Sequence, residues 1–179
     1  PSSITNNMLS NAATSASNTV YGIYPYACNN LNIYHNSVSL LSGSATGARA
    51  LYCNSTTTPA TGNISVKNNI FSVGNTGLAV EITSTVANYV SSMNNNLFNY
   101  NSSNTAPYKS GATSYSSISA WQLGTSFDAN SIEGDPLFLG ASNLHLQGLP
   151  ANGAGDNSVG VTTDIDGQVR PAAGSTIVD

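Results

Sequence analysis

Acid–base chemistry has few candidate residues in this chain of 179 residues. Residues 1–127 hold one carboxylate, Glu81, and three basic side chains, Arg49, Lys67 and Lys109. A glycoside hydrolase needs two carboxylates about 5–10 Å apart, and a polysaccharide lyase needs a strong base beside carboxylates. Within residues 1–127, Glu81 with Arg49 or Lys67 is the one charged constellation available, and the alternative is a surface ion pair that contributes little to stability. A carboxylate pair from residues 128–179 stays open as a second alternative. The scarcity of charge favours a protein without catalytic activity.

Tyrosines offer a second kind of site, because five of the nine lie within the 32 residues 21–52. An exposed ring beside hydroxyl and amide groups is a common platform for the face of a sugar. The residues on which we expect a glycan contact to centre are Tyr21, Tyr24, Tyr34, Lys67 and Arg49. The alternative is that the tyrosines only close the corners of the fold.

Metal binding has two weak candidates, Asp164 and Asp166, which stand on either side of Ile165 and precede Gly167. Two carboxylates one residue apart beside a glycine bend are how a Ca²⁺ loop starts, but the remaining ligands of such a loop are missing. We favour a hairpin turn stabilised by the aspartates and expect no cofactor, with Ca²⁺ as the alternative. His145 has no nearby Cys or second His, so we assign it no metal.

A six-residue motif recurs four times and indicates the elements that position these side chains. Each copy reads apolar, polar, polar, Asn, any residue, apolar. The shared asparagines, at steps of 29, 33 and 27 residues, are Asn7, Asn36, Asn69 and Asn96. A second row, at steps of 28 and 29 residues, is Ile23, Leu51 and Val80. Such a period is typical of a solenoid, whose coils bury a core only against their neighbours.

The repeated units are predicted to be strands. Short apolar runs alternate with polar residues in 31–34 and 78–82, and helical periodicity is missing before Ser116. Asparagine tolerates the left-handed backbone, and its amide can bond to the next asparagine in a stack. We therefore expect the four motif asparagines to form a ladder at one bend per coil. His35 takes the place that Asn holds in the other copies, so we expect it to act as a polar substitute there.

Two cysteines, Cys28 and Cys53, fall on adjacent coils if Gly22–Tyr24 is aligned with Ala50–Tyr52 and Pro25–Ala27 is treated as an insertion. Stacked strands lie about 4.8 Å apart, a separation that a disulfide accepts. The pair is therefore either a disulfide, as an oxidising compartment permits, or two buried thiols.

The composition is typical of an extracellular solenoid. Asn, Ser and Thr number 24, 27 and 17, whereas charged residues make up 7% of the chain, so solubility rests on neutral hydrogen-bonding groups. Residues 1–127 carry a net charge of +2 and residues 128–179 carry −6. No Lys/Arg stripe can neutralise a phosphate backbone, so we expect no nucleic-acid partner. No apolar run is long enough to predict a membrane span.

The last 90 residues carry a resemblance to a known family. Its motifs are Trp121–Gln122, Asp128–Ile132, Asp135–Phe138, Asn143–Leu146 and Thr162–Pro171. They are similar to the closing segment of secreted bacterial right-handed parallel β-helix proteins, in particular large surface proteins of the Bacteroidetes type. The resemblance implies a pectate-lyase-like β-helix that is part of a longer extracellular or cell-surface protein.

We therefore expect an all-β, right-handed parallel β-helix with a few coils over residues 1–105. Residues 106–179 are expected to form an irregular capping segment of the same domain, with a short helix near 117–122. The favoured function is a non-catalytic stalk or adhesin that binds glycans weakly or contacts another surface protein; the alternative is a fragment of a polysaccharide lyase or glycoside hydrolase. The strand edges of the first coil are expected to be unpaired or to stack on another chain.

Overall fold

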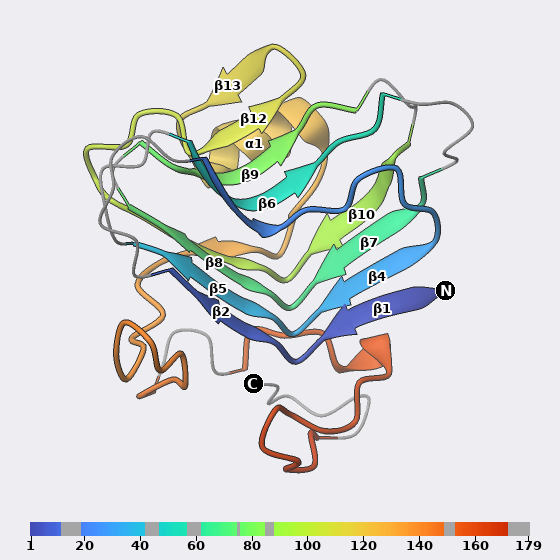
Figure 1. The fold of residues 1–179 in the computed structure, drawn as a ribbon, viewed down its shortest axis with the longest axis vertical. Coiled ribbons are helices and arrows are strands. Elements are labelled where there is room, and N and C mark those ends of the chain that lie inside the picture. Colours follow the sequence, from blue (N-terminus) through green and yellow to red (C-terminus); the bar gives the residue numbers. More distant parts are fainter. Residues whose placement is uncertain are drawn as a thin grey trace.

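The parts of the chain that the computed structural model describes are residues 1–11, 19–41, 47–56, 62–74, 76–84, 88–148 and 153–171. They form a parallel β-solenoid, so the predicted all-β β-helix is confirmed. Three sheets surround the interior, and the chain passes through the first, second and third sheet in each coil (Figure 1). No helix in the described parts is long and apolar enough to cross a membrane.

The strands of the three sheets follow the repeat. The first sheet contains β1 (Ser2–Thr5), β4 (Leu31–Tyr34), β7 (Ile64–Lys67) and β10 (Val90–Asn94). The second contains β2 (Met8–Ser10), β5 (Ser37–Leu40), β8 (Ile70–Val73), β11 (Leu97–Tyr100) and β14 (Ile132–Glu133). The third contains β3 (Val20–Ile23), β6 (Ala48–Cys53), β9 (Leu78–Ile82), β12 (Tyr108–Ser110) and β13 (Thr113–Tyr115). Neighbouring strands are parallel except for the antiparallel pair β12 and β13.

The core consists of three columns of inward-facing apolar side chains, one from each sheet. They are Ile4, Ile33, Val66 and Met93; Leu9, Val38, Phe71 and Phe98; and Ile23, Leu51, Val80 and Tyr108. Coils after the first bury their members, whereas Leu9 in the first coil is 36% exposed. Apolar burial between coils therefore holds the stack together.

An asparagine ladder runs along the bend between the first and second sheets. The Asn7 amide donates to Asn36 Oδ1 at 2.8 Å, Asn36 to Asn69 at 3.0 Å, and Asn69 to Asn96 at 3.1 Å. The backbone N–H of each of these three donors reaches the same acceptor oxygen. The three inner asparagines are 1% exposed. Because the ladder supplies partners to buried polar groups, it fixes both the bend and the register.

The residue before each ladder asparagine adopts the left-handed backbone at this bend. The expectation that the ladder asparagine itself makes both the turn and the hydrogen bonds is therefore wrong. Positive φ angles of 54–59° occur at Asn6, His35, Asn68 and Asn95. Asn68 Nδ2 lies 3.0 Å from His35 Nε2, so these residues form an outer polar column beside the ladder. The repeat thus uses one position for the turn and the next for the hydrogen bonds.

Helix α1 (Ile118–Thr125) covers the C-terminal end of the stack (Figure 1). Ser117 caps the N-terminus of this helix, and Trp121 is fully buried against the core. The ladder ends beneath the helix at Asp128, whose carboxylate accepts hydrogen bonds from Asn96 Nδ2 at 2.9 Å and Trp121 Nε1 at 2.8 Å. Strands β12 and β14 extend the sheets beyond residue 105, so the coil geometry reaches into the segment predicted to be a cap.

The opposite end of the stack is open within the described residues, because β1, β2 and β3 each pair with one other strand only. Residues 153–171, called here the C-terminal segment, contain a 3-10 helix (Asn157–Val159) and return along the outside of the asparagine bend (Figure 1). Asn95 donates to the Ala154 carbonyl at 3.1 Å, and Asn6 donates to the Thr163 carbonyl at 2.8 Å. The segment therefore spans from the last bend to the first.

The cysteine alignment expected from the sequence is wrong. Tyr26 forms a parallel bridge with Asn54, which places Cys53 opposite Pro25 rather than Cys28. The chain therefore contains no insertion at Pro25–Ala27. Both cysteines are free thiols, and burial raises the pKa of the Cys53 thiol far above its usual range.

Candidate functional site

A row of tyrosine rings covers the outer side of the third sheet at its first two strands. The Tyr52 ring on β6 stacks against Tyr24 at 4.8 Å and against Tyr21 on β3 at 5.1 Å. Tyr26 continues the row at 5.8 Å from Tyr24. Tyr21, Tyr24 and Tyr26 remain 40–47% exposed, so the row presents aromatic surface to solvent.

Three charged side chains lie next to this row. Glu81 on β9 accepts hydrogen bonds from Arg49 Nε on one oxygen and from Lys109 Nζ on the other, the latter at 2.7 Å. The Arg49 guanidinium carbon lies 5.7 Å from the centre of the Tyr21 ring and 5.4 Å from that of Tyr52, within the range of a cation–π contact. These seven residues, called here the tyrosine face, are Tyr21, Tyr24, Tyr26, Arg49, Tyr52, Glu81 and Lys109.

The Glu81 carboxylate is held in its ionised form. Burial alone raises the pKa of this carboxyl, but the hydrogen bonds and charges of Lys109 and Arg49 outweigh burial and leave the pKa below its usual value. Its side chain is 3% exposed. The two cations and one anion give the tyrosine face a net charge of +1, and both carboxylate oxygens are already bonded.

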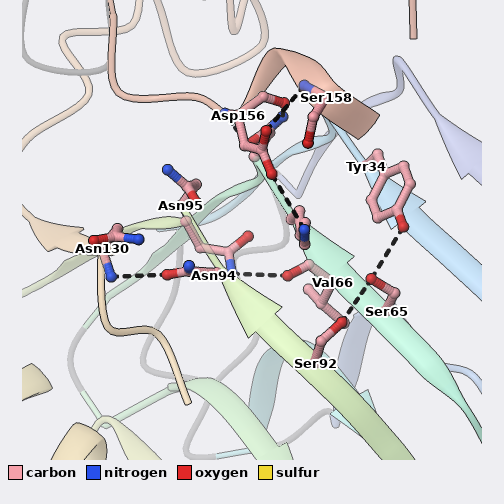
Figure 2. Close-up of polar contacts among 12 residues, drawn as sticks. Tyr34, Ser65, Val66, Ser92, Asn94, Asn95, Asn130, Asp156 and Ser158 are labelled. Carbon is pink, nitrogen blue, oxygen red and sulfur yellow. Dashed lines mark hydrogen bonds and ion pairs between the residues drawn. The ribbon is translucent and has the colours of Figure 1, made fainter. Parts of the chain in front are cut away.

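The site predicted from the sequence is divided between two sheets. Tyr21, Tyr24 and Arg49 meet on the third sheet, whereas Tyr34 and Lys67 lie at paired positions on the first. Tyr34 donates to Ser65 Oγ at 3.0 Å, which lies 2.8 Å from Ser92 Oγ (Figure 2). Lys67 forms an ion pair of 3.1 Å with Asp156 of the C-terminal segment. Lys67 therefore takes no part in the Glu81 cluster.

Sequence reasoning missed three members of the tyrosine face. Tyr26 and Tyr52 belong to the tyrosine cluster that the sequence shows, but their contact depends on the register between β3 and β6. Lys109 lies beside Glu81 because β12 continues the third sheet. Strand β12, the three residues after Pro107, does not show the repeat pattern of the earlier strands. The sequence therefore offered no signal for this pairing.

The aspartates considered for Ca²⁺ belong to a hairpin turn. Asp164 Oδ1 accepts the backbone N–H groups of Asp166 at 2.9 Å and Gln168 at 2.7 Å, and Gly167 has a φ of 80°. Asp166 Oδ2 lies 3.0 Å from His145 Nε2. Within the described parts of the chain, no three His, Cys, Asp or Glu side chains are grouped as metal ligands.

Comparison of the chain with protein-family models, with curated proteins and with solved structures gives no match.

Proposed function

We propose that this β-solenoid is a non-catalytic module of a bacterial extracellular or cell-surface protein, which binds a glycan on the tyrosine face. The observation that carries the proposal is the row of exposed, mutually stacked rings on the third sheet. Tyrosine supplies a large, rigid contact area that loses little conformational entropy on binding. Its ring can pack against the C–H face of a sugar, and its hydroxyl can exchange hydrogen bonds with sugar hydroxyls.

Rigid support favours recognition. Tyr52 on the neighbouring strand stacks against Tyr21 and Tyr24, and its hydroxyl accepts hydrogen bonds from Thr83 Oγ1 at 3.1 Å and Asn54 Nδ2 at 3.2 Å. Arg49 is oriented by Glu81 and by the Gly47 carbonyl at 2.9 Å. A binding surface whose side chains are already ordered avoids the entropy cost of ordering them when the ligand binds.

The bonding of Glu81 supports a binding role over glycoside hydrolysis at this face. A general acid in such a reaction needs a raised pKa and access to the glycosidic oxygen. The pKa of the Glu81 carboxyl is instead lowered, and both of its oxygens accept hydrogen bonds from cations. Arg49 and Lys109, the bases that a lyase would use, are the donors of those bonds.

A glycan array followed by titration calorimetry on the best ligand tests the proposal. We expect Tyr24→Ala to weaken binding at least about tenfold, because it removes an exposed ring of the kind that dominates binding energy. The matched control is Tyr34→Ala, which removes a tyrosine from the first sheet and should leave the affinity unchanged. If no ligand found on the array loses affinity in Tyr24→Ala, or if unsaturated products are released from a uronate polymer, the proposal is contradicted.

A further inference from the structure

A groove lies outside the second sheet, away from the tyrosine face. Its floor is formed by Met8, Ser37 and Ile70, outward residues that are paired across β2, β5 and β8. Its cover is formed by Leu144 and Leu146 and by the hairpin 162–170 of the C-terminal segment. The groove encloses about 320 Å³, inside the range of about 300–1,000 Å³ typical of small-molecule sites.

Ser37 explains why the space exists. The outward column continues from Ile70 to Leu97 on β11, where a separate pocket, also lined by Leu146, holds only about 50 Å³. At the first two coils the column is Met8 and Ser37, and the small serine leaves the larger space. Ser37 thus interrupts the column of outward apolar side chains at a point that Leu144, Leu146 and the hairpin 162–170 still cover.

The charged groups around the groove are held by the protein itself. Asp166 pairs with His145, and Asp164 accepts two backbone N–H groups. Arg170 donates to Asn6 Oδ1 at 3.2 Å and to the Thr163 carbonyl at 3.3 Å. A charged ligand would have to compete with these contacts, so the groove favours a neutral one.

Neutral polar groups remain open to the groove. Asn7 uses its amide nitrogen for Thr5 and Asn36, which leaves its Oδ1 as an acceptor. In the described residues, no hydrogen bond engages the Ser37 hydroxyl or the Gln168 side-chain amide, and both line the groove. An acceptor, a hydroxyl and an amide can together satisfy ligand hydroxyl groups, which both donate and accept. A purely apolar ligand would bury these groups without partners, which is unfavourable.

We infer that this groove binds a neutral pyranose sugar. Its C–H face packs on Ile70, Leu146 and Ile165, and its hydroxyls bond to Asn7 Oδ1, the Ser37 hydroxyl and the Gln168 amide. The site is separate from the tyrosine face and independent of the function proposed for it. A sugar here would bridge the first coils and the C-terminal segment, and would fix that segment to the stack.

Amide chemical shifts of the whole chain, recorded during titration with glucose, galactose, mannose and fucose, test the inference. We expect saturable shifts at Ser37, Leu146 and Gln168 for at least one sugar, with a millimolar Kd. Ser37→Leu should abolish these shifts and raise the melting temperature, since leucine continues the apolar column. Gln168→Ala, which breaks no hydrogen bond of the described chain, should weaken binding about threefold to tenfold.

Tyr24→Ala is the control, because it should leave the groove shifts unchanged while removing any binding at the tyrosine face. The inference fails if none of the four sugars gives saturable shifts at the groove. It also fails if a folded Ser37→Leu variant, or Gln168→Ala where the former does not fold, binds as the unaltered protein does. Saturable groove shifts with dodecanoate or acetate in place of the sugars would overturn the neutral-sugar assignment.

Discussion

Like residues gather at both the asparagine bend and the tyrosine face, but only the asparagines return at one position of every coil. Tyr21, Tyr24 and Tyr26 belong to the first coil, Tyr52 belongs to the second, and Glu81 is paired with Tyr52 on the third. The inner ladder asparagines are 1% exposed, and the amides of Asn36 and Asn69 each donate to the next asparagine. The tyrosine rings also contact one another, yet three of them keep 40–47% of their surface exposed. Repetition at a buried position therefore contributes stability, whereas the clustered outward tyrosines leave aromatic surface exposed to solvent.

The largest expected effect comes from removing one rung of the ladder. Asn69→Ala deprives the Ile33 and Lys67 carbonyls and Asn96 Oδ1 of a donor, and it leaves the buried backbone N–H of Asn36 without its acceptor. Since each buried unpaired group is destabilising, we expect the free energy of unfolding to fall by about 3–5 kcal/mol. Urea denaturation followed by circular dichroism measures it.

Asn7→Ala is the matched control, because Asn7 stands at the open end of the same ladder and is exposed. Its loss should lower the free energy of unfolding by about 1 kcal/mol. Equal losses for Asn7→Ala and Asn69→Ala would show that burial does not set the strength of a rung.

The asparagine ladder could be predicted from the sequence more fully than the tyrosine face, for a physical reason. The ladder was predictable in register because the same residue returns at each coil and its flanking apolar residues return with it. The tyrosine face was only partly predictable, because spacing along the chain does not tell which of three sheets carries a side chain. Tyr34 and Lys67 were therefore grouped with residues of the third sheet, although they lie on the first.

The groove had no local signal at all. Asn6 and Thr163, which are bonded across its edge, are separated by 157 positions in the sequence. A hairpin turn around Asp164 could be predicted from its own residues, but the place where it docks could not. The contacts of an irregular segment depend on the surface of the folded solenoid, and no repeating sequence pattern predicts them.

The second-largest expected loss of stability comes from the ion pairs of Glu81 in the tyrosine face. Glu81→Gln removes the anion between Arg49 and Lys109, so we expect the free energy of unfolding at pH 7 to fall by about 2 kcal/mol. This lies below the effect at Asn69 because Arg49 and Lys109 are 23% and 33% exposed and regain water.

Glu81→Gln should also change the dependence of stability on pH. The pKa of Glu81 is lowered in the folded state from a reference value of 4.5. The stabilisation is therefore complete above that value and is lost as the pH falls through the folded pKa. Burial raises the pKa of Asp128, which gives that group the opposite slope in both proteins. The difference between the two urea-derived stability curves isolates Glu81, and a difference that stays constant from neutral to acid pH would contradict the assignment.

The smallest effect separates a binding role of the tyrosines from a structural one. Tyr21→Ala removes a ring that is 40% exposed and that contacts Tyr24, Tyr52 and the Arg49 guanidinium. Aromatic and cation–π contacts at exposed positions are each weak, so we expect the free energy of unfolding to fall by only about 1 kcal/mol. If the tyrosines instead close the corner of the solenoid, as the alternative from the sequence holds, Tyr21→Ala should be as destabilising as Asn69→Ala. A small loss in urea denaturation, together with weakened glycan binding, would assign the tyrosine face to recognition.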